Sequence, residues 1–176
     1  MSKKEIDQNK MAENKKEKRI FTAGIITASD SSANGEQEDE SGKILDYMLK
    51  DRGFEIKYYI VIPGEVDRIQ EALVLLCDDI KADLVITTGG IGFSKRDVTP
   101  EATLGIIDRE APGISEALRY YGLQKNPNVM LSRGVAGIRR NTLIINLDGS
   151  VRGVRQSFES IIDTIYHGLE IITEEA

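Results

Sequence analysis

The stretch Asp-Leu-Val-Ile-Thr-Thr-Gly-Gly-Ile-Gly, residues 83–92, decides the fold. Residues Asp83 to Thr88 form a short β-rich run, the clearest strand signal in the chain. This strand leads directly into glycines, which lack a Cβ and let the backbone come close to a phosphate. A simple turn is an equally good explanation of the glycines alone. The spacing fits neither a dinucleotide-binding fingerprint nor a P-loop.

Predicted strands and helices alternate on both sides of this stretch. We expect strands at 20–28, 54–62 and 142–147, and helices at 41–52, 65–81 and 151–172. A further helix is expected after the glycines, with Thr99 as N-cap and Pro100 at its first position, broken at Pro112-Gly113 and followed by a helical segment to about Tyr121. This order predicts the α/β class: three layers, α/β/α, with a mostly parallel sheet and helices on both faces.

Three loops follow predicted parallel strands and should therefore open onto the same edge of the sheet. They contain Ser29-Asp30, the run from Gly89 to Asp97, and Gly149-Ser150. Ligands in such sheets bind beyond the carboxyl ends of the strands, so this edge is the expected site.

The composition restricts the chemistry that this site can perform. A length of 176 residues favours one domain, and the single cysteine, Cys77, excludes an internal disulfide and fits a reducing, cytoplasmic compartment. Cys77 sits in an apolar run and is expected to be packed and inert. One histidine, His167, cannot supply a zinc site, so we expect catalysis by carboxylates, arginines, backbone amides and Mg²⁺.

Charge is unevenly distributed along the chain. Residues 1–19 carry seven basic and four acidic residues with almost no apolar ones, which predicts a disordered charged tail ahead of a domain at 20–176. It is no signal peptide, and no stretch is apolar enough to span a membrane. The domain has net charge −9, which argues against nucleic-acid binding. Residues 117–158 nevertheless carry seven basic residues and one acid, as expected of a focused anion site, although some of these arginines should pair with acids elsewhere.

The glycine stretch continues as Thr-Thr-Gly-Gly-Ile-Gly-Phe-Ser-Lys-Arg-Asp-Val-Thr-Pro-Glu-Ala-Thr, residues 87–103. This run resembles the hallmark segment of the MogA/MoaB family of molybdopterin adenylyltransferases, which includes a domain of gephyrin. The similarity covers nearly the whole domain. Further matches follow in the family's order: Ser29-Asp30, Asp-Glu-Ser-Gly at 39–42, Ala-Pro-Gly-Ile-Ser-Glu at 111–116, Leu-Ser-Arg at 131–133, Ala-Gly-Ile-Arg at 136–139 and Leu-Ile-Ile-Asn-Leu at 143–147.

The resemblance implies a reaction, cofactors and an assembly. The terminal phosphate of molybdopterin would react with Mg-ATP to give adenylylated molybdopterin and pyrophosphate, in a homotrimer. Because the attacking phosphate is already ionised, no protein nucleophile is required. Asp97 matches the family's essential aspartate, with Mg²⁺ as its expected ligand, and Glu65 is a second candidate catalytic carboxylate. The expected substrate and nucleotide contacts are Ser29, Asp30, Gly89, Gly90, Gly92, Arg96, Ser132, Arg133, Gly149 and Ser150.

Three positions depart from the family pattern. Gly64 stands where relatives have aspartate, Ile91 where they have threonine, and Asp148 where they have proline. The first departure predicts that Gly64→Asp restores a lost ligand, unless Glu65 already compensates or Gly64 needs a positive φ. Together they leave open a second hypothesis, a non-catalytic trimeric protein that binds molybdopterin or a nucleotide, and a third, a structural role with a vestigial pocket.

Overall fold

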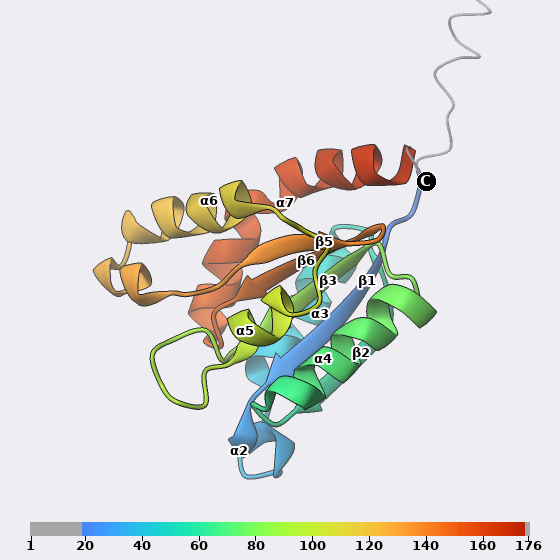
Figure 1. The fold of residues 1–176 in the computed structure, drawn as a ribbon. Coiled ribbons are helices and arrows are strands. Elements are labelled where there is room, and N and C mark those ends of the chain that lie inside the picture. Colours follow the sequence, from blue (N-terminus) through green and yellow to red (C-terminus); the bar gives the residue numbers. More distant parts are fainter. Residues whose placement is uncertain (1–18, 175–176) are drawn as a thin grey trace, which may run out of the picture.

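The computed structural model describes residues 19–174, which form one six-stranded sheet with helices on both faces (Figure 1). The strands are β1 (Thr22–Ala28), β2 (Glu55–Ile62), β3 (Leu84–Thr88), β4 (Arg109–Glu110), β5 (Ala136–Arg139) and β6 (Thr142–Leu147), in the order β2-β1-β3-β6-β5-β4. Strands β2, β1, β3 and β6 are parallel, whereas β5 and β4 form an antiparallel edge. The predicted mostly parallel sheet is confirmed. The predicted tail lies outside the described residues, except for Arg19.

Two apolar layers fix the helices against the sheet. Helices α3 (Glu40–Asp51), α6 (Pro112–Leu123) and α7 (Val151–Glu174) cover one face, where Ile25, Ile86 and Ile145 point. Helix α4 (Val66–Val74), the π-helical turn η1 (Leu75–Asp79) and α5 (Thr99–Leu104) cover the other, and Ile26, Val85 and Ile144 point there. Because neighbouring strand residues point to opposite faces, continuous apolar strands bury both sides. The three-layer prediction is confirmed.

Two predictions about the middle of the chain are wrong. The helix expected to continue from Thr99 to Pro112 ends at Leu104, and Pro112 instead begins α6 after the two-residue strand β4. Proline suits both roles because a helix start does not need its missing N–H. The N-cap of α5 is Val98, and the Thr99 hydroxyl donates to the Gly89 carbonyl at 2.9 Å. Thr99 therefore ties the helix to the glycine loop.

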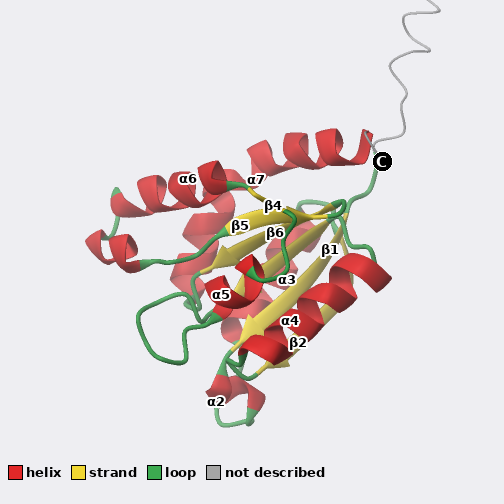
Figure 2. Cartoon of the chain, in the orientation of Figure 1, coloured by secondary structure: helices red, strands yellow, loops and turns green. Residues whose placement is uncertain are grey.

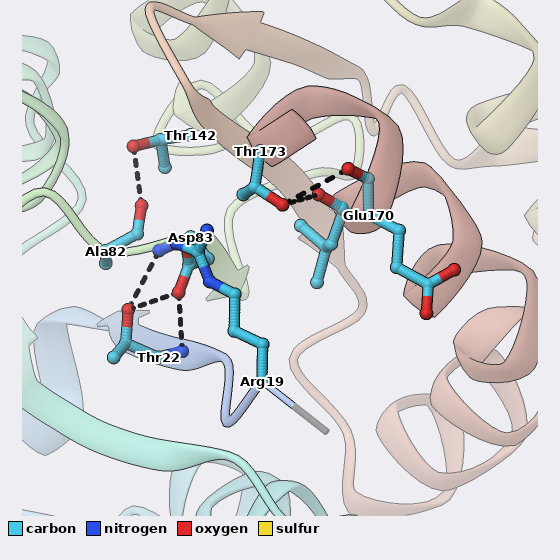
Figure 3. A network of polar contacts seen from close by, with 8 residues as sticks. Arg19, Thr22, Ala82, Asp83, Thr142, Glu170 and Thr173 are labelled. Carbon is cyan, nitrogen blue, oxygen red and sulfur yellow. Dashed lines mark hydrogen bonds and ion pairs between the residues drawn. The ribbon is translucent and has the colours of Figure 1, made fainter. Parts of the chain in front are cut away.

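The amino ends of β1 and β3 are joined at the end of the sheet opposite to the glycine loop (Figure 3). The buried carboxylate of Asp83 accepts hydrogen bonds from the amide and hydroxyl of Thr22, both at 2.8 Å, and from Arg19 at 2.7 Å. At the same edge, the hairpin between β5 and β6 carries Arg139, which donates two hydrogen bonds to Asp78 of η1. These polar contacts stabilise the end of the sheet that lies away from the glycine loop.

Candidate functional site

The three loops predicted to share one edge do converge there. The Gly89 amide donates to the carbonyl of Leu147, the last residue of β6, at 3.1 Å. A Cβ on Gly89 would lie 2.5 Å from the carbonyl oxygen of Ala28 at the end of β1, and one on Gly149 would lie 3.0 Å from the Gly89 Cα. Gly89 and Gly90 also have positive φ angles, 88° and 66°, which L side chains rarely adopt. Close packing of three strand ends thus explains the glycines before any ligand is considered.

Two cavities adjoin this convergence and share Ser150. The acidic cavity, about 440 Å³, lies between the ends of β1 and β3 and the start of α3, and its lining includes Ser29, Glu38, Asp39, Glu40, Ser41, Gly89, Gly149 and Ser150. The basic cavity, about 510 Å³, lies between α6, η2 (Pro127–Leu131) and the start of α7, and its lining includes three cations and two acids together with Gly92, Ser132 and Ser150: Arg119, Lys125, Arg152, Asp148 and Glu159. Six of the ten predicted contact residues therefore line a cavity: five line one cavity each, and Ser150 lines both. The remaining predicted contacts line neither.

Asp39 occupies the floor of the acidic cavity and was not among the predicted site residues. Its carboxylate caps α3 by accepting from the Gly42 amide at 2.9 Å, and it also accepts from Ser41 at 2.9 Å and from the Tyr59 hydroxyl at 2.5 Å. Burial alone would raise the pKa of Asp39, but hydrogen bonding with Thr27, followed by that with Tyr59, Gly42 and Ser41, outweighs it and leaves the pKa lowered. Burial and the same carboxylate raise the pKa of Tyr59. Asp39 is thus a fixed negative charge inside a polar cavity.

Asp97 lies on the long loop that leaves β3 and projects before α5 (Figure 2). The Ser94 amide donates to Asp97 Oδ2 at 2.8 Å, which fixes the carboxylate, and no protein donor within residues 19–174 reaches Oδ1. Arg133 braces the loop from the other side. Its guanidinium donates to the Gly92 carbonyl at 2.6 Å, to the Asp97 carbonyl and to Glu101.

The predicted ligand contacts Asp30 and Arg96 bind each other. Arg96 donates to both carboxylate oxygens of Asp30, at 2.8 and 2.9 Å, and the Gly64 amide donates to the same carboxylate at 2.9 Å. Hydrogen bonds from Arg96 and then from Gly64 lower the pKa of Asp30 to about 2. Glu65 lies 3.6 Å from Arg96 and is half exposed. Gly64 has no positive φ, so that explanation of the glycine is wrong.

The predicted basic segment divides among three places. Arg119, Lys125 and Arg152 line the basic cavity, whereas Arg139 and Arg140 pair with Asp78 at the opposite end of the sheet and Arg133 holds the Asp97 loop. The seventh basic residue, Arg155, is exposed on α7 and lines neither cavity. The segment is therefore no single anion site, although three of its cations line one cavity. The sequence could not separate these groups, because residues 139 and 152 are close in the chain but lie at opposite ends of β6.

The departures Asp148 and Ile91 have structural explanations. Asp148 Oδ1 accepts from the Ser150 amide at 2.6 Å, and a Cβ on Gly153 would lie 2.5 Å from the same oxygen, so the carboxylate sits against the first turn of α7. A carboxylate there is stabilised by the helix dipole. Ile91 is buried and reaches Gly134 beneath the glycine loop.

The one cysteine and the one histidine, both within residues 19–174, line neither cavity. Cys77 is buried, as predicted, and burial raises the pKa of its thiol to about 11. His167 is exposed on α7, 3.6 Å from Glu170. Among residues 19–174, no group of three or more histidine, cysteine or acidic side chains is arranged to hold a metal ion, and no helix could cross a membrane.

Comparison with known proteins agrees with this geometry. A family model described as "Probable molybdopterin binding domain" matches residues 24–167. The chain is 38% identical over 154 residues to the molybdopterin adenylyltransferase of Helicobacter pylori, covering 85% of this chain and 86% of that protein. This chain belongs to the MogA/MoaB family. The MoaB structure from Thermus thermophilus, a molybdopterin biosynthesis enzyme, is 42% identical to it with a TM-score of 0.84, over 88% of this chain and 98% of that one. The molybdopterin adenylyltransferase of Escherichia coli is 36% identical over 153 residues, covering 83% and 78%. The MogA/MoaB membership predicted from residues 87–103 is therefore confirmed.

Proposed function

We propose that this protein acts in molybdenum cofactor biosynthesis, transferring AMP from Mg-ATP to the terminal phosphate of molybdopterin. The observation that carries the proposal is the pair of cavities that meet at Ser150, beside the Gly89 loop. A reaction that joins two ligands through their phosphates needs two binding spaces with a common boundary. The relatives from Helicobacter and Escherichia named molybdopterin adenylyltransferase support the same reaction.

The reaction needs little covalent chemistry from the protein. An oxygen of the molybdopterin phosphate attacks the α-phosphorus of ATP, the bond from that phosphorus to the oxygen bridging to the β-phosphate breaks, and pyrophosphate leaves. The attacking oxygen is already ionised, so the buried thiol of Cys77 and the exposed His167 are not required. Aligning the two phosphates supplies much of the rate enhancement.

Asp97 is the residue proposed to hold Mg²⁺. It presents one carboxylate oxygen that no protein donor in residues 19–174 occupies, while Ser94 fixes the other. Mg²⁺ commonly binds one or two carboxylates together with substrate phosphates and water, so a single well-held carboxylate suits it. When bound, Mg²⁺ would neutralise charge on the phosphates. Arg119, Lys125 and Arg152 would add positive charge from the basic cavity.

A homotrimer is part of the proposal, and an exposed apolar patch on α6 and η2 supports association. The patch is made of Tyr120, Tyr121, Leu123, Met130 and Leu131, each between 40% and 63% exposed. Helix α6 and η2 are in contact with each other, and exposed apolar side chains on two such neighbouring elements favour a protein interface. We expect light scattering to give a trimer for the wild type and for Tyr47→Glu, an equally exposed tyrosine on α3, and smaller species for Tyr120→Glu. A trimer in all three would exclude this patch as the interface.

The decisive experiment measures pyrophosphate. Purified protein with ATP and Mg²⁺ should release pyrophosphate only when molybdopterin is added, and AMP should appear on the pterin. Release that does not require molybdopterin would contradict the proposal. Molybdopterin binding without any release would favour the second hypothesis, a non-catalytic binding protein.

Cytoplasmic location stays a prediction, based on the single unpaired cysteine.

A further inference from the structure

Arg96 is held in a dock built from two loops that follow strands. Asp30, the first residue of α2 (Asp30–Ala33), comes after β1, and Gly64 and Glu65 come after β2. Arg96 makes a two-point contact with Asp30 at 2.8 and 2.9 Å, and Glu65 lies 3.6 Å away. Paired contacts of this kind fix the orientation of a guanidinium as well as its position.

A second contact, besides the one with Arg96, orients the carboxylate of the dock. The Gly64 amide donates to Asp30 Oδ1 at 2.9 Å, which orients the carboxylate from the β2 side. The backbone also has to come close, because a Cβ on Gly64 would lie only 2.9 Å from the carbonyl oxygen of Arg96. A side chain at position 64 would therefore keep the Asp97 loop away from β2.

The dock and Arg133 hold the same loop from opposite sides. The dock fixes Arg96, the residue directly before Asp97, and Arg133 binds the carbonyls of Gly92 and Asp97. Between these points the loop is exposed, and the Phe93 ring is 70% exposed and packs little against the domain. Without Arg96, the Asp97 segment would depend on Arg133 and on local hydrogen bonds.

We propose that Asp30 is a positioning residue that acts through Arg96, holding Asp97 in place before any ligand binds. This differs from the direct ligand contact expected from sequence, because both Asp30 oxygens already accept hydrogen bonds from within the protein. The consequence for catalysis rests on the proposed adenylyl transfer, whereas the consequence for the loop does not.

Hydrogen exchange of the ligand-free protein tests the structural half. The amides of Ser94, Asp97 and Val98 donate hydrogen bonds within the loop. Asp30→Ala and Arg96→Ala should each raise their exchange rates about fivefold through more frequent local opening. Asp163→Ala, which breaks an exposed arginine–aspartate pair with Arg52 on another face, should leave these rates unchanged. Unchanged rates in Asp30→Ala would overturn the proposal.

A double-mutant cycle on transfer tests the catalytic half. If Asp30 acts only through Arg96, the double variant should be as slow as Arg96→Ala alone. Asp30→Glu, which keeps a carboxylate within reach of Arg96, should recover part of the loss in kcat with little change in KM. Losses that multiply in the double variant would mean that Asp30 contacts the ligand or metal directly, and the proposal would be wrong. If even the wild type fails to transfer AMP, the adenylyltransferase proposal fails, while the exchange experiment still decides the role of Asp30.

Discussion

The structure reverses the effect that the sequence predicts for a substitution at Gly64, one of the three departures from the family pattern. The sequence alone suggests that Gly64→Asp would restore a missing carboxylate and raise activity. In the structure, the new Cβ would lie 2.9 Å from the Arg96 carbonyl oxygen, below the approximately 3.4 Å of an ordinary contact. The loop that carries Asp97 would have to retreat by about 0.5 Å. We therefore expect Gly64→Asp to lower activity.

The expected loss follows from that displacement. A misplacement of about 1 Å can cost about a hundredfold in rate, so half of it should cost about tenfold, or ~1.4 kcal/mol in the activation barrier. Gly64→Ala should show this tenfold loss. Gly64→Asp should be slower still, because Asp30 and Glu65 already share the single charge of Arg96. Crowding should lower the free energy of unfolding by only about 1 kcal/mol, since an exposed loop can yield.

Pyrophosphate release under saturating substrates measures the effect, with thermal unfolding run in parallel. Gly113→Ala is the matched control, because a Cβ there meets nothing within 4 Å and the backbone has no positive φ. It should keep the wild-type rate. A tenfold gain in Gly64→Asp would refute the steric argument and revive the missing-ligand hypothesis. A wild-type rate in Gly64→Ala would show that the loop adapts at no cost.

Three further predictions concern individual charges. Asp97→Asn should keep the fold while slowing transfer about a hundredfold, because a lost metal contact raises the activation barrier by ~3 kcal/mol. Wild-type kinetics in this variant would show that Asp97 has no role in catalysis. In titration calorimetry at two salt concentrations, Arg152→Ala should weaken ATP binding and reduce its dependence on salt. Arg140→Ala is the control, because Arg140 pairs with Asp78 at the far end of the sheet, and it should change neither quantity. Equal effects of the two variants would show that net charge alone governs binding. Asp39→Ala should cost ~2 kcal/mol of unfolding free energy at neutral pH, through the lost cap and the unpaired Tyr59 hydroxyl. Because folding lowers the pKa of Asp39, the ionised carboxylate contributes fully to the free energy of unfolding above its unfolded pKa, near 4, and this contribution is lost as the pH falls through the folded value. In urea unfolding, the difference in free energy between wild type and Asp39→Ala should therefore narrow below about pH 4.

The parallel part of the fold was predictable because its signals are local. Strands β1, β3 and β6 are apolar on both faces, and such runs between amphipathic helices favour few arrangements. Strands β4 and β5 have two and four residues, too few for any periodicity, and so the antiparallel edge was missed. Pro112 predicts a helix break as readily as a helix start, because proline occurs at both positions.

The position of the site was predictable, but the partners within it were not. Strands that alternate with helices are parallel, so the loops after β1, β3 and β6 had to open at the same end of the sheet. Which carboxylate pairs with which arginine depends on side-chain reach across loops. Arg96 and Asp30 are 66 residues apart, and Arg133 and Gly92 are 41 apart, and nothing local in the sequence relates them. Asp39 is part of the Asp-Glu-Ser-Gly match at 39–42, but a match at a helix start does not distinguish a capping residue from a residue that lines a cavity.

These pairings change where the charge for binding phosphates must come from. Arg96 is neutralised by Asp30 with Glu65 nearby, and Arg133 by Glu101, so the two arginines next to Asp97 contribute little net positive charge to a ligand. Their guanidinium groups instead fix the loop, which is the contribution that arginine forks make best. In the proposed reaction, positive charge would then come from the cations of the basic cavity and from the Mg²⁺ proposed to bind Asp97. Binding affinity and transfer rate should therefore be separable: variants in the basic cavity change the affinity for anionic ligands, and variants at Asp30 or Arg96 change the rate at which bound ligands react.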